Sequence, residues 1–231
     1  MVRNKIIPRH VGIIMDGNRR WARKHGLTTV EGHRKGYGQA VKIAEHAFKR
    51  GVKYLTLYAF STENWKRSAL EVSFLMNLLL QMIDIESEKL HKKGIRMKFL
   101  GSHKRLQAKV LSAMDRAEKL THSNSKGMLL VALNYGGRTE IIEAVRSLMK
   151  DKSTSQKITE KSIKSHLSSA KIPDPDFIIR TSGEQRLSGF LLWEAAYSEL
   201  YFTSVLWPAF GIRDFDKALE EYANRKRRFG S

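Results

Sequence analysis

A short stretch near the start of the chain combines a carboxylate with two arginines. The apolar residues 11–15 are followed by Asp16, by a Gly-Asn turn, and then by Arg19 and Arg20. The N–H groups at the start of a helix, together with arginine side chains, attract phosphate. A carboxylate repels bare phosphate, so a divalent cation that bridges Asp16 and a phosphate would explain the combination. The alternative is that Asp16 only caps a helix while the arginines face solvent.

Two further polar stretches come directly after apolar runs. Residues 61–67 follow the alternating run 54–60, and residues 180–188 follow the apolar run 177–179. Because the carboxyl ends of parallel strands meet at one edge of a sheet, we expect the three polar stretches to lie close together. Neither a Walker P-loop nor a dinucleotide-binding glycine motif follows any of these runs, so the sequence does not favour a nucleotide-binding protein.

The elements that must position these residues alternate along most of the chain. Runs rich in β-branched and aromatic residues predict strands at 11–15, 54–60, 95–100, 129–133 and 177–179. Helical spacing of apolar residues predicts one helix from Arg19, one around 41–48, and others at 70–89, 103–120, 139–149, 159–170 and 215–225. This order predicts an α/β fold, a three-layer domain with a central, mainly parallel β-sheet flanked by helices. We expect residues 1–231 to form one such domain.

Composition limits the class of protein. The chain has 231 residues, of which 42% are hydrophobic, enough for one full core. It contains no cysteine, which rules out disulfides and thiol chemistry and agrees with a reducing cytoplasm. Residues 1–9 are charged, and no apolar run approaches the roughly 18 residues of a membrane span. We therefore expect a soluble, cytoplasmic protein.

The net charge of +19 indicates an anionic partner, unless it is general surface lysine. An enzyme acting on phosphorylated substrates and a nucleic-acid-binding protein both fit that charge. A nucleic-acid binder should interleave basic residues with exposed aromatic residues or carry a known module. Here the arginines recur beside glycines and acids at predicted strand ends, which favours the enzyme and predicts no nucleic-acid partner.

Several long motifs, in order, resemble the cis-prenyltransferase family, which includes undecaprenyl diphosphate synthase. The motifs are His10–Ala22, Gly32–His33, Leu57–Arg67, Asn134–Arg138, Arg180–Ser188, Phe190–Trp193 and Ser198–Phe202. The resemblance extends from His10 to Gly230, nearly the whole chain.

The resemblance implies a reaction and its partners. Farnesyl diphosphate, an allylic diphosphate, would condense with successive isopentenyl diphosphates in the presence of Mg²⁺, adding cis double bonds. The product would be a long-chain polyprenyl (undecaprenyl) diphosphate, the lipid carrier precursor for cell-wall glycan synthesis. The resemblance also implies a homodimer in which the terminal residues 228–230 reach the partner's site, and peripheral association with a membrane for product release.

The family's functional residues carry over one by one. The resemblance assigns metal binding to Asp16 and Glu199, and catalysis to Asp16 and Asn64. The residues that match substrate-binding positions are Gly17, Asn18, Arg19, Arg20, Trp21, His33, Ser61, Glu63, Trp65, Arg67, Arg180, Arg186 and Ser188. Arg20 and the backbone of residues 17–19 would hold the allylic diphosphate. Isopentenyl diphosphate would be held by Arg180, Arg186 and Ser188. The sequence does not decide which group accepts the departing proton.

Each of these residues also has an ordinary structural explanation. His33 would fit a helix-start or buried hydrogen-bonding role, Trp65 a packing role, Glu63 a solvated charge, and Glu199 an ion pair with a basic neighbour. A joint coincidence across five motifs is improbable, so the family assignment is favoured. The chain departs from the usual family pattern at Thr29, Ser68, Ser182, Gly189 and Ala209. A longer-chain, dehydrodolichyl-type synthase stays open, whereas a non-catalytic partner subunit would lack the Asp and Arg motifs.

The predicted helix 70–89 has an unusually wide apolar face. Its polar stripe consists only of Ser73, Asn77, Gln81 and Asp84, so the face exceeds what one sheet contact needs. One interpretation is that this face, including Leu79 and Ile83, lines a tunnel of about 30 Å for the growing prenyl chain. The other is that it forms a dimer contact or lies deep in the core. The segment is similar in length to that of the undecaprenyl enzymes.

Overall fold

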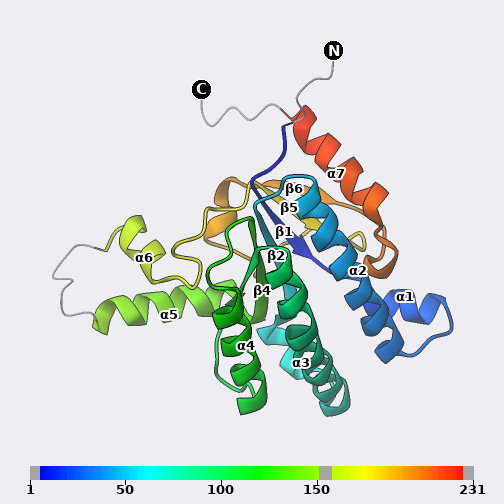
Figure 1. Ribbon diagram of the computed structural model, residues 1–231, viewed down its shortest axis with the longest axis horizontal. Helices are drawn as coiled ribbons and strands as arrows, with labels where there is room; N and C mark the ends of the chain where they lie inside the picture. The colour runs from blue at the N-terminus through cyan, green and yellow to red at the C-terminus, as the bar shows by residue number, and fades with distance from the viewer. Residues whose placement is uncertain (1–5, 151–157, 226–231) are drawn as a thin grey trace.

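The sheet of this protein is entirely parallel in the described part of the chain. The computed structural model describes residues 6–150 and 158–225 (Figure 1). Six strands pair in the order β3-β4-β2-β1-β5-β6, and every neighbouring pair is parallel. The strands are β1 (His10–Ile14), β2 (Tyr54–Ser61), β3 (Ile95–Leu100), β4 (Gly127–Tyr135), β5 (Phe177–Arg180) and β6 (Glu199–Phe202). The prediction of an α/β fold with a mainly parallel sheet is confirmed.

Helices occupy the connections, as the periodicity predicts. They are α1 (Asn18–Lys24), α2 (Thr29–Lys49), α3 (Ala69–Lys92), α4 (Ala108–Thr121), α5 (Gly137–Lys150), α6 (Glu160–His166) and α7 (Ile212–Asn224). Short 3-10 helices are η1 (Thr62–Lys66), η2 (Glu194–Tyr197) and η3 (Trp207–Ala209). Several predicted boundaries are wrong, because α2 starts already at Thr29, α4 only at Ala108 and α7 already at Ile212, and α6 ends already at His166. Most of the polar stretch after β2 forms the short helix η1.

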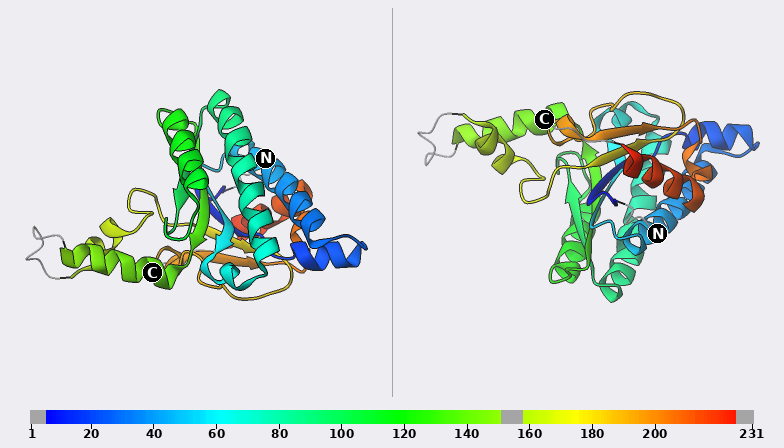
Figure 2. Two further views of the ribbon diagram at one scale, coloured as in Figure 1. Left: turned by 90° about the horizontal axis from the view of Figure 1, so that it is seen from below. Right: turned by 90° about the horizontal axis from the view of Figure 1, so that it is seen from above.

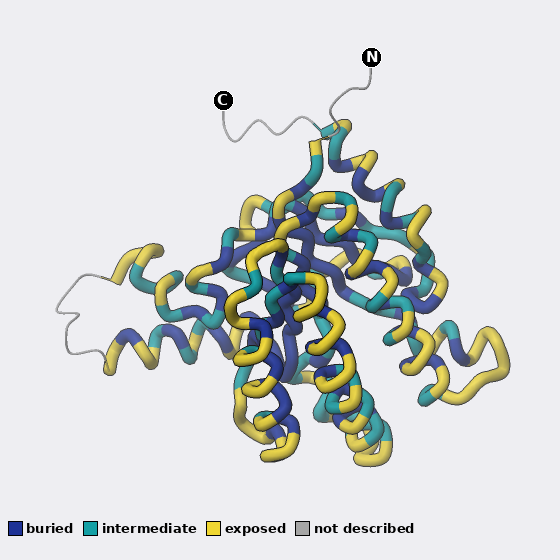
Figure 3. Tube along the Cα trace, viewed as in Figure 1, coloured by how far each residue is buried: buried dark blue, intermediate teal, exposed yellow. Residues whose placement is uncertain are grey.

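The two faces of the sheet are covered differently. Helices α2, α3, α4 and α7 pack on one face and form the larger apolar core with the strands (Figure 1). The other face is packed by the largely irregular chain around Ile172 and Phe190–Ala195. Helices α5 and α6 pack on each other and extend away from the four-helix layer (Figure 2). The expectation of helices flanking the sheet is therefore met fully on one face only. In Figure 3 the buried residues follow the strands and the inner sides of these helices.

The turn after β1 sets up the functional edge of the sheet. Gly17 has a φ of +113°, a conformation that glycine adopts without strain, and it turns the chain from β1 into α1. Gly17 is also the N-cap residue of α1, which has no side-chain capping hydrogen bond. The interpretation of Asp16 as a helix cap is therefore wrong. None of the described helices has the length and hydropathy needed to cross a membrane.

Candidate active site

A polar cavity of about 600 Å³ lies at the carboxyl ends of β1, β2, β4 and β5. Residues from all three polar stretches line it, as the sequence predicts. The predicted site residues in its wall are Asp16, Asn18, His33, Ser61, Glu63, Asn64, Arg67, Arg180 and Ser188. An adjoining pocket of about 440 Å³ shares several of these residues and adds Gly17, Arg19 and Arg20. The sequence did not single out Arg23 and Arg138, which line the pocket and the cavity respectively.

Asp16 is the carboxylate at the centre of this edge. Arg180 Nη2 donates to Asp16 Oδ2 at 2.9 Å, and Arg20 Nη2 lies 3.4 Å from Asp16 Oδ1. Partial burial raises the pKa of Asp16, but the hydrogen bond and charge of Arg180 outweigh it and hold the pKa below its usual value. The Asp16 side chain is 31% exposed. Asp16 is therefore ionised and still accessible from the cavity.

Arg180 ties the Asp16 carboxylate to the chain that follows β5. It is only 4% exposed, and its Nη1 donates to Ser188 Oγ at 2.7 Å and to the carbonyl of Arg186. A buried guanidinium with fixed partners keeps its position without reorganising. Arg180 therefore presents a fixed positive charge to anything bound beside Asp16 and Ser188.

Arg20 is held by the same segment through a residue that departs from the family pattern. Its Nη2 donates to Ser182 Oγ at 2.6 Å, and its Nη1 donates to the Ser182 carbonyl at 3.1 Å. Ser182 has a φ of +80°, a left-handed conformation that favours glycine. The serine has a use at this position, since its hydroxyl fixes Arg20.

His33 and Arg67 share a carboxylate that the sequence analysis missed. His33 Nε2 lies 3.2 Å from Glu71 Oε1, and Arg67 Nη1 donates to the same oxygen at 2.9 Å. Burial lowers the pKa of His33. Burial raises the pKa of Glu71, but its bonds to His33 and Arg67 bring it below the usual value. His33 is therefore neutral and donates to an ionised Glu71. Ser68 caps α3, and Arg67 and Glu71 on either side of it are four residues apart. This spacing suits an ion pair and is the sequence signal that could have identified Glu71.

Three predicted binding residues do not line these cavities. Trp21 stacks on His25 with ring centroids 4.2 Å apart. Trp65 Nε1 donates to Asn134 Oδ1 at 2.7 Å, and its ring packs edge-on against Phe60. The Arg186 side chain is 61% exposed and pairs with a neighbouring glutamate, Glu184. The two tryptophans pack against residues in or next to α1 and η1, whereas the Arg186 guanidinium is exposed and paired outside the two cavities.

Glu199 is not brought to Asp16 within this chain. It is the first residue of β6 and pairs in register with Phe177, the first residue of β5. Asp16 instead follows the carboxyl end of β1, beyond the level of Arg180. At about 3.3 Å per residue, the strands separate Glu199 from that edge by roughly 10 Å or more. Glu199 accepts from Arg225 Nη1 at 2.8 Å, so it does not meet Asp16 within this chain, and its assignment to metal binding stays a prediction.

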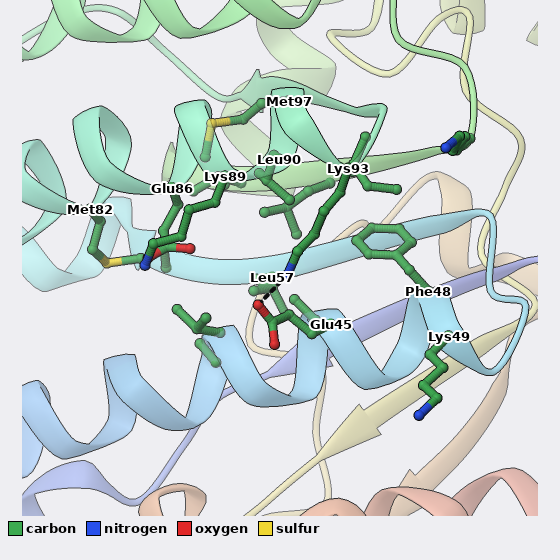
Figure 4. A pocket seen from close by; sticks show the side chains of 18 of the residues that line it. Glu45, Phe48, Lys49, Leu57, Met82, Glu86, Lys89, Leu90, Lys93 and Met97 are labelled. Atoms are coloured by element: carbon green, nitrogen blue, oxygen red, sulfur yellow. Dashed lines mark hydrogen bonds and ion pairs between the residues drawn. The ribbon is translucent and has the colours of Figure 1, made fainter.

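An apolar cavity of about 470 Å³ adjoins the polar one (Figure 4). It lies between the sheet and helices α2 and α3, and its lining includes Met82, Glu86 and Leu90 of α3. Met15 and Ala59 line both cavities. The α3 residues predicted for a tunnel, Leu79 and Ile83, instead belong to the core cluster. One part of the wide apolar face of α3 therefore packs in the core, and another part forms a wall of the cavity. The core interpretation and the cavity interpretation each hold for part of this face.

At the end away from the polar cavity, lysines and glutamates surround the apolar cavity. Lys93 donates to Glu45, which joins α3 to α2 across the cavity (Figure 4). Glu86 accepts from Lys89 Nζ at 2.8 Å and from Tyr37 Oη at 2.9 Å. The cavity therefore runs from a polar site to a charged outer margin, with an apolar wall between them.

Comparison with known proteins agrees with this geometry. A family model described as putative undecaprenyl diphosphate synthase matches residues 14–230. An isoprenyl transferase of Thermotoga maritima is 50% identical over 226 residues, covering 97% of both chains. A decaprenyl diphosphate synthase of Mycolicibacterium smegmatis is 47% identical over 228 residues, covering 97% of this chain and 78% of that protein.

A solved structure shows the same similarity in three dimensions. Lavandulyl diphosphate synthase from Lavandula x intermedia, in complex with dimethylallyl diphosphate, has a TM-score of 0.94 and 37% sequence identity. The match covers 97% of this chain and 99% of that one. The family match over nearly the full length, together with the cavity geometry, leads to one conclusion: this chain belongs to the cis-prenyltransferase family of isoprenyl transferases, the family of undecaprenyl diphosphate synthase.

Proposed function

We propose that the chain catalyses the Mg²⁺-dependent condensation of farnesyl diphosphate with successive isopentenyl diphosphates, adding cis double bonds. The observation that carries this proposal is the junction at Met15 and Ala59, which line both the polar and the apolar cavity. Such a junction suits a substrate with a charged head and a hydrocarbon tail, because each part then meets surroundings of its own polarity. The reacting carbons would lie at the junction.

The arginines suit the charge that develops in this reaction. Cleavage of the allylic C–O bond leaves negative charge on the departing diphosphate, which fixed cations stabilise. Arg20 and the start of α1 would hold the allylic diphosphate, whereas Arg180, Ser188 and a repositioned Arg186 would hold isopentenyl diphosphate. Separate cationic groups for the two diphosphates allow both substrates to bind at once.

The donor set fits a magnesium ion held jointly by protein and substrate. Mg²⁺ prefers oxygen ligands and commonly uses one or two carboxylates together with substrate phosphates. Asp16 offers one ionised, partly exposed carboxylate at the cavity, and it would hold the ion together with diphosphate oxygens. When bound there, the ion supplies further stabilisation of the leaving diphosphate.

Residues near the junction would orient isopentenyl diphosphate. Ser61 N–H donates to Asn64 Oδ1 at 3.1 Å, which fixes the Asn64 amide at the cavity wall. Glu63 and Tyr58 line the same wall, and burial raises the pKa of Tyr58 above its usual range. Tyr58 is thus a neutral hydrogen-bonding group rather than a base at neutral pH. We assign Asn64 a catalytic role in holding the second substrate over the allylic carbon.

The apolar cavity would shelter the growing chain, and we propose a product of the undecaprenyl class. Helix α3 has 24 residues and contains the predicted segment 70–89, whose length resembles that of the undecaprenyl enzymes. The named relatives include a decaprenyl diphosphate synthase and a lavandulyl diphosphate synthase. Product sizing is therefore the part of the assay that identifies the activity of this chain.

We also propose a cytoplasmic homodimer that releases its product at a membrane surface. Exposed apolar side chains on the projecting α5, Ile142 and Met149, would be covered in a dimer. The terminal residues 228–230, expected to reach the partner's site, lie outside the described residues. A monomer in sedimentation at micromolar concentration, with full activity, would contradict the dimer.

Incorporation of radiolabelled isopentenyl diphosphate tests the proposed function. We expect Mg²⁺-dependent incorporation with farnesyl diphosphate as primer, and a product of the undecaprenyl class on chromatography. Absence of incorporation, together with a salt-sensitive shift of RNA or DNA, would instead support the nucleic-acid-binding alternative. A much longer product would support a dehydrodolichyl-type synthase.

A further inference from the structure

Two buried glutamates lie together behind the active-site edge of the sheet. Glu140, in the first turn of α5, is 8% exposed, and Glu194, the first residue of η2, is 4% exposed. In the described part of the chain, neither forms an ion pair with a lysine or arginine. Buried carboxylates without such a partner are uncommon and need another explanation.

The two carboxylates have unequal hydrogen-bonding partners. Glu140 accepts from Tyr135 Oη, from Ser168 N at 3.2 Å and from Ser168 Oγ. Glu194 accepts from Ser169 Oγ, its own backbone N–H also favours the charged form, and its buried Oε2 has no partner among the described residues. Three donors from other residues stabilise an ionised Glu140, whereas only Ser169 does so for Glu194 and one of its oxygens is left without a partner. The proton of the pair therefore belongs on Glu194.

The groups that face Glu194 favour the same state. They are Glu140 of α5, Tyr135 of β4, and Ser169 and Asp174 of the chain before β5. Burial, followed by the charge of Glu140, raises the pKa of Glu194 to about 7. Burial likewise raises the pKa of Tyr135 above its usual range, so its hydroxyl remains a neutral donor.

The chain leading to Glu194 forms part of the active-site wall. Gly189 and Leu192 line the polar cavity, and Gly137 N–H donates to the Gly189 carbonyl at 2.8 Å. The Phe190 ring stacks on Tyr58, which also lines that cavity, with centroids 4.8 Å apart. The segment 188–192 is thus fixed at one end by Arg180 and is followed directly by the turn that contains Glu194.

We propose that Glu194 is a positioning residue whose neutral form, packed beside ionised Glu140, holds segment 188–192 in the active-site wall. Loss of its proton to solvent places two negative charges in one buried space. Their repulsion displaces η2 and, with it, Ser188 and Gly189. The enzyme then binds isopentenyl diphosphate less well at alkaline pH. This inference rests on the proposed function, because it concerns the substrate side of the same site.

The pH profile of Glu194→Gln tests the proposal. For the wild type we expect kcat/KM for isopentenyl diphosphate to fall above about pH 7, approaching about tenfold per pH unit, mainly through KM. Glutamine keeps the shape and cannot ionise, so this variant should lack that fall between pH 7 and 8. The matched control is Glu160→Gln, at an exposed position in the first turn of α6, and it should keep the wild-type profile. An unchanged alkaline fall in Glu194→Gln would overturn the proposal.

A stability measurement separates this proposal from the proposed function. Between pH 4.5, the usual pKa, and about 7, folded Glu194 keeps a proton that the unfolded chain releases. The proton therefore stabilises the fold fully below pH 4.5, and this contribution is lost as the pH rises through 7. Chemical unfolding should show this decline in wild type and a smaller one in Glu194→Gln, and infrared difference spectra should lose one protonated-carboxyl band in the variant. Identical stability profiles and spectra would refute the neutral glutamate even if prenyl transfer is confirmed. If the stability profiles and the spectra both differ as expected but the protein does not transfer prenyl groups, only the proposed function is refuted.

Discussion

Arg180 Nη2 donates to Asp16 Oδ2 at 2.9 Å, although the two residues lie 164 positions apart in the sequence. The contact follows from the pairing of β1 with β5, which sets Ile14 beside Arg180. The same guanidinium holds Ser188. Asp16, the candidate metal ligand, is therefore hydrogen-bonded to the candidate diphosphate-binding residues Arg180 and Ser188 as one network. Substitutions in this network should affect the binding of more than one substrate.

Substitution of Asp16 should abolish turnover without unfolding the protein. Asp16→Asn removes the negative charge but keeps the side chain's shape, so Mg²⁺-dependent kcat should fall by about 10³-fold. Circular dichroism should show an unchanged fold. Asp115→Asn, at a side chain that is 59% exposed, serves as control. Turnover of Asp16→Asn within threefold of wild type would contradict the assignment.

Arg186 and Arg180 should differ in substrate selectivity. Arg186→Ala removes an exposed side chain, so it should raise KM for isopentenyl diphosphate by about tenfold to a hundredfold with little change for the primer. Arg180→Ala should weaken the binding of both substrates, because Arg180 also holds Asp16. Steady-state kinetics with each substrate varied in turn measures this difference. A selective effect of Arg180→Ala on isopentenyl diphosphate alone would show that the Asp16 contact is dispensable.

Bulk in the apolar cavity should shorten the product. Met82 lines the cavity, so Met82→Trp should fill part of it and stop elongation early while the first condensation continues. Ile85, on the same helix but 50% exposed, gives the matched control Ile85→Trp. Chromatographic sizing of the labelled products measures the change. If Met82→Trp leaves the product length unchanged and weakens the dimer, the tunnel lies elsewhere in the protein.

His10 should make the fold sensitive to acid. Its Nδ1 lies 2.7 Å from the Pro173 carbonyl and its Nε2 2.7 Å from Thr56 Oγ1. This arrangement suits the neutral ring, with the Nδ1–H donating and Nε2 accepting. Burial lowers the pKa of His10 to about 4. The unfolded chain takes up a proton between pH 6.5 and 4 while the folded protein does not, so stability falls as the pH is lowered through this range.

The loss in the free energy of unfolding attributable to His10 should reach about 3 kcal/mol near pH 4, at 1.36 kcal/mol per pKa unit. Denaturant unfolding at several pH values measures it. His10→Gln is expected to be less stable at pH 7 and to show a shallower acid decline. An equal acid decline in both proteins would mean that other groups cause it.

Local sequence patterns determined the elements and the polar edge of the sheet. Strands β2 and β5 can be recognised from their composition, because side chains that must be buried are apolar and often β-branched. Polar residues such as Asp16, Asn64 and Arg180 come directly after such runs, so a parallel sheet necessarily gathers them at one edge. For that reason most of the predicted site residues line the polar cavity or the pocket beside it.

The tertiary structure alone decided which polar groups meet. The register of β5 with β6 sends Glu199 to the opposite edge from Asp16, and spacing along one strand contains no information on register with another. The partnership of His33 with Glu71 depends on how α2 and α3 pack. Glu140 and Glu194, 54 positions apart in the sequence, share a buried space only because η2 folds back behind β4. Contacts between distant segments arise from packing of the whole chain, and local periodicity does not encode them.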